Sequence, residues 1–320
     1  MKRTILSACI CLTLLTACTA PTQTVTPVLT EAPTTTETPI LPTETMTAEI
    51  SSPTALPPTA TATYSPDSWM TLPVYPETIS QRVIEIYQLG QSLGNNPRAF
   101  SRMGDCDSLP FSFLGDFDRG SDHYNLGEYE ELAGVIEYFQ GSWEHAGVTA
   151  HDGYNTATML SPLWADPEVC QSGETPLDCE IRTSKPAFML IALGSNDFGQ
   201  PKRFETNMRV ILDKLIENGI VPILGTKADN LEGNHQINSI IGQLAYEYQL
   251  PVWNFWLAVQ PLDNHGVRDD DNYHPTHPGF DGMPNDFSNP VNMQYGFPWR
   301  NLTALQTLDA IMRGVAKGSN

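Results

Sequence analysis

Three short apolar runs, at residues 187–193, 220–224 and 251–255, most constrain how this chain folds. Their length and composition are typical of buried strands. Between and around them, apolar residues recur at three-and-four spacing, most clearly at 204–218, where Gly219 marks the stop. We predict helices at 78–93, 128–139, 204–218, 235–248 and 302–315. Alternating helices and strands are typical of a parallel sheet covered by helices, so the sequence predicts an α/β domain.

The N-terminal segment has the pattern of an export signal. Two basic residues precede an apolar run at 5–15, which is too short to span a bilayer as a permanent helix. The run ends in LTAC at 15–18, which resembles the lipobox of bacterial lipoproteins. That resemblance implies a signal peptide at 1–17, a lipid anchor on Cys18, and a domain held outside the cytoplasm at the cell membrane. The alternative is an ordinary signal peptide in which Cys18 has no such role.

Residues 18–68 differ in composition from the rest of the chain. After Cys18 they are mainly Thr, Pro, Ala and Ser, with no Lys or Arg and no apolar periodicity. Such a segment cannot bury enough surface to offset its conformational entropy, so we expect a disordered stalk. The remainder, 69–320, has the length of one domain with a sizeable core, expected to act as a monomer.

The net charge of -20 excludes some classes of partner. It argues against a nucleic acid and against electrostatic attachment to anionic lipid. We therefore expect membrane contact only through the N-terminal lipid.

The cysteines fit an exported protein. Cys9 and Cys11 lie in the predicted signal peptide, and Cys170 and Cys179 flank a turn-rich segment that can close into a small disulfide loop. Two buried thiols are the alternative, because spacing does not establish the geometry of the pair. If the bridge forms, Cys106 is left as an unpaired thiol.

Three polar clusters contain the parts of an acyl-transfer site. They lie at 104–106, 194–197 and 271–274, with the sequences GDC, GSND and DNYH. The first offers a thiol nucleophile in Cys106, the second an amide in Asn196 for an oxyanion, and the third a base in His274. Asp271, three residues before His274, can orient the imidazole and stabilise its charge.

These clusters resemble, in order and spacing, the motif blocks of the GDSL/SGNH hydrolase family. The resemblance covers most of 80–315 and implies a flavodoxin-like three-layer α/β/α sandwich with a central five-stranded parallel sheet. It also implies esterase-type chemistry, often deacetylation of a carbohydrate, without a metal or other cofactor. By the family pattern, Cys106 is the nucleophile, His274 and Asp271 complete the triad, and Asn196 with Gly153 forms the oxyanion hole. The substrate is then a small-molecule or carbohydrate ester, at the cell surface or in the environment.

The thiol leaves other functions open, because the family pattern has serine where Cys106 stands. A thiolate is the better nucleophile, but the larger sulfur changes the reach toward the oxyanion donors. Ser108 is a substitute nucleophile by composition, although the turn would present the residue directly after Gly-Asp. A catalytically silent surface module that binds a carbohydrate-like ligand is the alternative from another functional class.

A metal site is a further alternative. Three carboxylates at 269–271 lie close in sequence to His274 and His277, and imidazole with carboxylate suits zinc. No HExxH helix or other known ligand set accompanies them, and neighbouring prolines restrict how the two imidazoles converge. We therefore predict a hydrolase without a metal.

Overall fold

The computed structural model describes residues 64–279 and 283–318. The predicted signal peptide, the lipid anchor at Cys18 and nearly all of the predicted stalk lie outside the described residues. The compact unit that holds the described residues is Ala60–Asn320. Trp69, at the predicted start of the domain, is completely buried. Within the described ranges, no helix combines the length and apolar character needed to cross a membrane.

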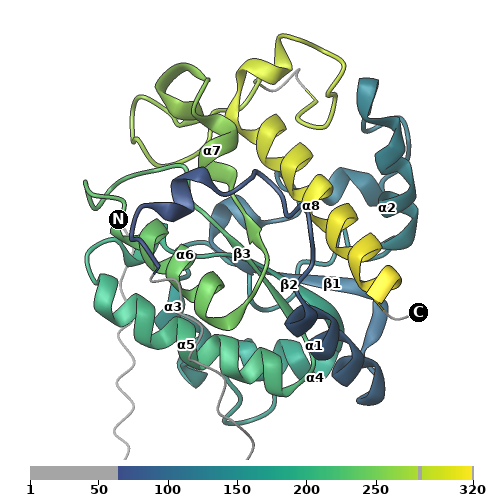
Figure 1. The fold of residues 1–320 in the computed structure, drawn as a ribbon, viewed down its shortest axis with the longest axis vertical. Helices are drawn as coiled ribbons and strands as arrows, with labels where there is room; N and C mark the ends of the chain where they lie inside the picture. The colour runs from purple at the N-terminus through teal and green to yellow at the C-terminus, as the bar shows by residue number, and fades with distance from the viewer. Residues whose placement is uncertain (1–63, 280–282, 319–320) are drawn as a thin grey trace, which may run out of the picture. The chain divides into compact units, whose positions relative to one another are not determined.

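A parallel sheet lies at the centre of this unit, as predicted (Figure 1). Its strands are β1 (Asn96–Gly104), β2 (Pro186–Ala192), β3 (Val221–Gly225) and β4 (Val252–Trp253). They pair in the order β1-β2-β3-β4, and every pair is parallel. All of β3 and nearly all of β2 are buried, which explains why these strands read as continuous apolar runs.

The prediction of five strands is wrong in its count, because the described residues form a four-stranded sheet. Residues 149–151 lie along the free edge of β1 but make only one bridge, between Ala150 and Gly104. Near this bridge, side chains form hydrogen bonds with backbone groups that could otherwise extend the ladder. The Val148 N–H donates to the Glu180 carboxylate at 2.8 Å, and the Thr149 hydroxyl donates to the Arg102 carbonyl at 2.7 Å.

The helices cover the sheet in two groups. One group contains α1 (Gln81–Ser92), α2 (Ala133–Tyr138) and α8 (Gly296–Gly318), with α8 contacting both others. The second contains α3 (Thr156–Met159), α4 (Pro176–Ser184), α5 (Pro201–Glu217) and α6 (Gln236–Tyr248). The short α7 (Phe255–Val259) follows β4 and contacts α8. In Figure 1, α8 and α2 lie on one side of the strands and α5 and α6 on the other. Right-handed crossovers place the consecutive connections α5 and α6 on the same face.

Helix α5 shows how the sequence specifies these elements. Pro201 occupies its first turn, where the missing N–H costs nothing, and Gly219 follows its end at a positive φ of 65°. Five apolar side chains at three-and-four spacing form its buried face: Phe204, Met208, Ile211, Leu212 and Leu215. This face packs against β3 and α6, in agreement with the helix predicted at 204–218.

The Cys170–Cys179 disulfide predicted from spacing is present. It closes the loop that leads into α4, where Thr175 caps the helix by accepting the Asp178 N–H. Among the described residues, Cys106 is the free cysteine.

Candidate functional site

The candidate site lies at the carboxyl ends of the strands, where open α/β sheets bind ligands. The 3-10 turn Cys106–Ser108 follows β1, and the 3-10 turn Ser195–Asp197 follows β2. Asp105 caps the first turn by accepting the Asp107 N–H at 3.2 Å. Parallel strands thus bring two of the three sequence clusters to one edge of the sheet.

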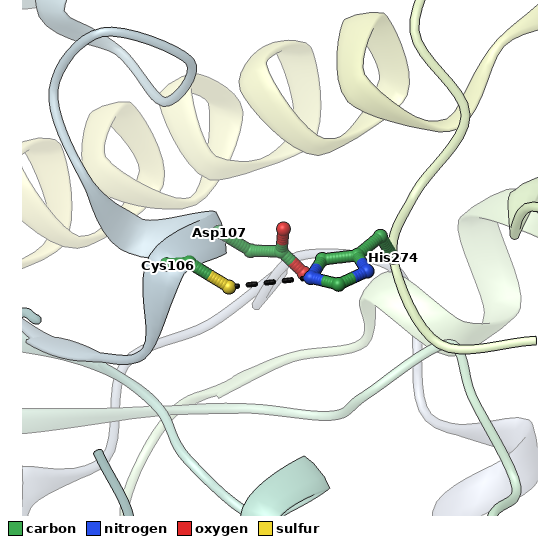
Figure 2. Close-up of side chains that lie close together, drawn as sticks. All are labelled: Cys106, Asp107 and His274. Carbon is green, nitrogen blue, oxygen red and sulfur yellow. Dashed lines mark hydrogen bonds between the residues drawn. The ribbon is translucent and has the colours of Figure 1, made fainter. Parts of the chain in front are cut away.

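The loop that carries His274 joins them and completes a hydrogen-bonded chain. His274 Nε2 lies 3.3 Å from Cys106 Sγ, and His274 Nδ1 lies 2.8 Å from Asp271 Oδ2 (Figure 2 shows the cysteine and histidine). The other Asp271 oxygen accepts the backbone N–H groups of Tyr273 and His274, at 2.9 and 3.0 Å. Asn272 has a positive φ of 54°, a conformation that asparagine tolerates and that closes this short turn. Cys106, His274 and Asp271 therefore lie in contact in series.

The contacts of Asp271 suit it to hold the imidazole. Partial burial alone would raise its pKa, but hydrogen bonds from His274 and from the backbone of Tyr273 and His274 lower it. A carboxylate at this position keeps the proton of His274 on Nδ1 and leaves Nε2 free to face the thiol.

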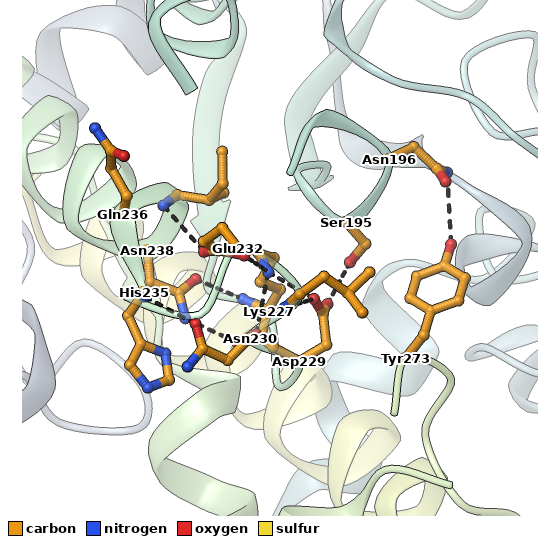
Figure 3. Close-up of polar contacts among 12 residues, drawn as sticks. Ser195, Asn196, Lys227, Asp229, Asn230, Glu232, His235, Gln236, Asn238 and Tyr273 are labelled. Atoms are coloured by element: carbon orange, nitrogen blue, oxygen red, sulfur yellow. Dashed lines mark hydrogen bonds and ion pairs between the residues drawn. The ribbon is translucent and has the colours of Figure 1, made fainter. Parts of the chain in front are cut away.

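Asn196 lies in the site, but its amide already has partners. Its Nδ2 donates to the Tyr154 carbonyl at 3.0 Å and lies 3.4 Å from the Tyr273 hydroxyl and 3.5 Å from Asp105 Oδ2. Figure 3 shows Asn196 facing the Tyr273 phenol. An oxyanion would have to compete with these oxygens for the amide N–H groups.

Gly153 lies at the exposed rim beside this amide. Its φ of 75° favours glycine, and a Cβ there would meet no atom within 4 Å. The next residue, Tyr154, supplies the carbonyl that Asn196 contacts. Thr156 links this loop to the Asn196 turn, because its N–H and hydroxyl both donate to the buried Asp197 carboxylate.

Burial keeps the Cys106 thiol protonated. Burial, with help from the nearby Asp105 and Asp107 carboxylates, raises the pKa of this thiol to about 12. Burial also raises the pKa of Asp107 to about 7 and that of Asp105 above its usual range. A preformed thiolate is therefore disfavoured at neutral pH, so nucleophilic attack requires His274 to remove the proton during the reaction.

Two residues that the sequence analysis did not assign shape the site. The Tyr273 hydroxyl donates to Asp105 Oδ2 at 2.8 Å and lies 4.0 Å from Cys106 Sγ. Arg300, buried in α8, donates to the Asp107 carbonyl at 3.3 Å and stacks on Phe113 at 4.3 Å. Tyr273 lies inside the third cluster, at 271–274, so its place in the sequence could have indicated that it belongs to the site. Arg300 is distant in sequence and lies in an ordinary helical pattern, so no local signal could identify it.

Ser108, the substitute nucleophile, points into the protein. Its side chain is 1% exposed, and its hydroxyl accepts a hydrogen bond from Arg300 at 3.4 Å. A Cβ on Gly104 would lie 2.0 Å from this hydroxyl oxygen, which shows why glycine precedes the turn. The geometry favours Cys106 as the residue that the turn presents to His274.

The structure does not bring together the alternative metal-ligand group at 269–271, His274 and His277, apart from the contact of Asp271 with His274. Asp270 pairs with Arg268, and the His277 ring lies 5.7 Å from the Phe297 ring. A different group comes together around His274. The ligand atoms of Cys106, Asp107 and His274 all lie within 4.8 Å of one another (Figure 2).

A hollow of about 740 Å³ opens beside the thiol and the imidazole. Its lining includes Phe111, which is 69% exposed, and the buried Phe297. The side chains of Cys106, Asp107 and His274 all face it. This space gives a ligand access to the sulfur.

No protein-family model matches this chain, and no curated protein sequence matches it.

Proposed function

We propose that this chain is an extracytoplasmic acyl hydrolase of the SGNH type, with Cys106 as its nucleophile. One observation carries the proposal, the continuous contact from Cys106 Sγ through His274 to the Asp271 carboxylate, at 3.3 and 2.8 Å. A nucleophile, a base and a group that orients the base are the three parts that acyl transfer requires.

The reaction would begin as a substrate ester approaches the sulfur. His274 Nε2 accepts the thiol proton while Cys106 Sγ attacks the ester carbonyl carbon, and Asp271 stabilises the imidazolium. Asn196, Gly153 and the Cys106 N–H would donate to the tetrahedral oxyanion. When the intermediate collapses, His274 returns the proton to the leaving alcohol and a thioester remains on Cys106. Water, deprotonated by His274, then releases the acid and restores the thiol.

The hollow beside the thiol supports a small acyl group on a carbohydrate as the substrate. About 740 Å³ accommodates a ligand of that size, within the range of known small-molecule pockets. The exposed ring of Phe111 at its edge offers an apolar face on which a sugar can stack. The substrate is then a carbohydrate ester at the cell surface or in the environment.

The strand arrangement supports the flavodoxin-like form of the fold. Counting the bridged segment 149–151 as an incomplete strand gives the spatial order 2-1-3-4-5. That order is one of the two common arrangements of doubly wound sheets. The Cys170–Cys179 disulfide suits an exported domain, and the LTAC sequence at 15–18 would anchor it by lipid on Cys18.

Hydrolysis of p-nitrophenyl acetate by the full chain tests this function. We expect release of p-nitrophenol by the wild type and its loss in Cys106→Ala and His274→Ala. Ser108→Ala should retain the activity, because this hydroxyl contacts Arg300 and not the imidazole. Activity that survives in Cys106→Ala would refute a thiol nucleophile.

A catalytically silent binding module is the second candidate, and two observations favour it. The pKa of the Cys106 thiol is raised to about 12, and the Asn196 amide is already hydrogen bonded. Cys106→Ser separates the two functions. Activity that appears only in Cys106→Ser would indicate that the hydrolase framework is intact but that Cys106 does not hydrolyse the ester.

A further inference from the structure

We propose that Cys106, Asp107 and His274 form a zinc-binding site at the edge of the 740 Å³ hollow. This site uses Asp107, which has no part in the acyl-transfer chain. The inference does not rest on the proposed hydrolase function, because it requires only that these three side chains share an ion.

The three ligand types suit zinc better than the commoner hard cations. Zinc binds thiolate, imidazole and carboxylate, whereas magnesium and calcium prefer oxygen ligands alone. Three protein ligands with an open fourth position, filled by water, are typical of zinc sites that remain accessible. Here the hollow provides that access, because all three side chains line it and are only partly buried.

The distances leave room for the ion between the ligand atoms. Zinc lies about 2.3 Å from sulfur and about 2.0 Å from an imidazole nitrogen, so tetrahedral geometry puts these two ligand atoms about 3.5 Å apart. Cys106 Sγ and His274 Nε2 are 3.3 Å apart, and the nearest Asp107 oxygen lies within 4.8 Å of both. The three ligand atoms are therefore close enough to share one ion.

No hydrogen bond fixes the carboxylate of Asp107. Among the described residues it accepts none, because Arg300 donates to the Asp107 backbone carbonyl, although the Arg300 guanidinium still interacts with this carboxylate electrostatically. A partly buried carboxylate can only accept, so hydrogen-bond donors or a cation stabilise it. A bound cation would supply this stabilisation.

The contact that orients His274 is already in place. His274 donates from Nδ1 to Asp271, which fixes the ring and directs Nε2 toward Cys106 and Asp107. Asp271 is itself held by two backbone N–H groups. Carboxylate–histidine–zinc arrangements use this same order of contacts. Because zinc would occupy the sulfur lone pair needed for acyl transfer, the metal-bound and nucleophilic states exclude each other.

Competition with a chromophoric zinc chelator, using the full chain and zinc alone, tests the site. We expect the wild type to bind one more equivalent of zinc than Cys106→Ala, Asp107→Asn or His274→Ala. Asp271→Asn should weaken the binding of this equivalent by about ten- to a hundredfold, because the imidazole loses the carboxylate that orients it. Asp270→Asn is the matched control and should bind as the wild type does, because this exposed carboxylate pairs with Arg268.

Cobalt provides a readout that is independent of affinity. Cobalt bound by the wild type should show the near-ultraviolet charge-transfer absorption of a thiolate–cobalt bond, and Cys106→Ser should lack it while circular dichroism shows that it is folded. Zinc uptake that is the same in the wild type and all three ligand variants would overturn the proposal, as would a wild type that takes up no zinc at micromolar concentrations. Neither result involves an ester, so it leaves the proposed hydrolase function to its own test.

Discussion

The buried carboxylate of Glu180 allows a prediction of stability that follows from the structure alone. Glu180 is 1% exposed and lies in α4, beneath β1. Its oxygens accept hydrogen bonds from Ser101, Ser184 and the Val148 N–H, at 2.6 to 2.8 Å, and lie 2.9 Å from His145 Nε2. Burial alone would raise its pKa, but these hydrogen bonds outweigh burial and lower the pKa to about 2.

The size and sign of the effect follow from linkage. A carboxyl group whose pKa falls from 4.5 to about 2 on folding stabilises the folded state by about 3 kcal/mol at neutral pH. This contribution is complete above the unfolded pKa. It is lost as the pH falls through the interval between 4.5 and about 2.

Urea unfolding from pH 7 down to about pH 2, with the disulfide intact, measures this contribution. Other carboxyl groups titrate over the same range, so the comparison of the wild type with Glu180→Gln isolates the contribution of Glu180. The free energy of unfolding of the wild type should fall by about 3 kcal/mol more than that of Glu180→Gln. Glu217→Gln, at an exposed position, is the control and should follow the wild type. Parallel curves for the wild type and Glu180→Gln would refute the reasoning.

Three further predictions follow from the site and the core. Asp271→Asn should lower kcat for an ester by about 10⁴-fold, because the amide favours the wrong imidazole tautomer. Asp270→Asn should leave kcat unchanged, and equal rates for the two variants would contradict the role assigned to Asp271. Burial raises the pKa of the Cys106 thiol from 9.0 to about 12, which lowers its thiolate fraction at neutral pH about a thousandfold. Because a thiolate of higher pKa is also more nucleophilic, alkylation by iodoacetamide should be at least about tenfold slower than that of a free thiol. Mass spectrometry of the Cys106 peptide measures this rate, and a rate like that of free cysteine would argue against the raised pKa. Leu212 lies in the buried face of α5, so Leu212→Ala should lower the free energy of unfolding, measured in urea, by about 2–5 kcal/mol. A loss below about 1 kcal/mol would mean that this side chain is not in the core.

The parts of the fold that the sequence predicted depend on local patterns. Helix α5 and strands β2 and β3 show clear periodicity or continuous apolar character, because each buries its apolar side chains against fixed neighbours. The fifth strand was overpredicted. Next to 149–151, the Val148 N–H donates to Glu180, which lies in a distant part of the sequence. No local pattern reports such a contact.

The candidate site divides in the same way. Asp271 and His274 are three residues apart, so one short turn sets their contact, and the sequence predicted it. The parallel strands then bring Cys106 and Asn196 to the same edge of the sheet. The occupation of the Asn196 amide by Tyr154 and Tyr273, and the position of Asp107 beside the thiol, depend on side-chain packing in three dimensions. Spacing in the sequence carries no information about them.

Trapping the acyl-enzyme tests the central claim most directly. The full chain is mixed with p-nitrophenyl acetate, quenched in acid within the first turnover, digested, and the acetylated residue is located by mass spectrometry. The proposed function predicts an acetyl group on the Cys106 peptide that hydroxylamine removes, and its absence from His274→Ala. A wild type that releases p-nitrophenol while Cys106 stays unmodified, or that is acetylated only elsewhere, would contradict Cys106 as the nucleophile.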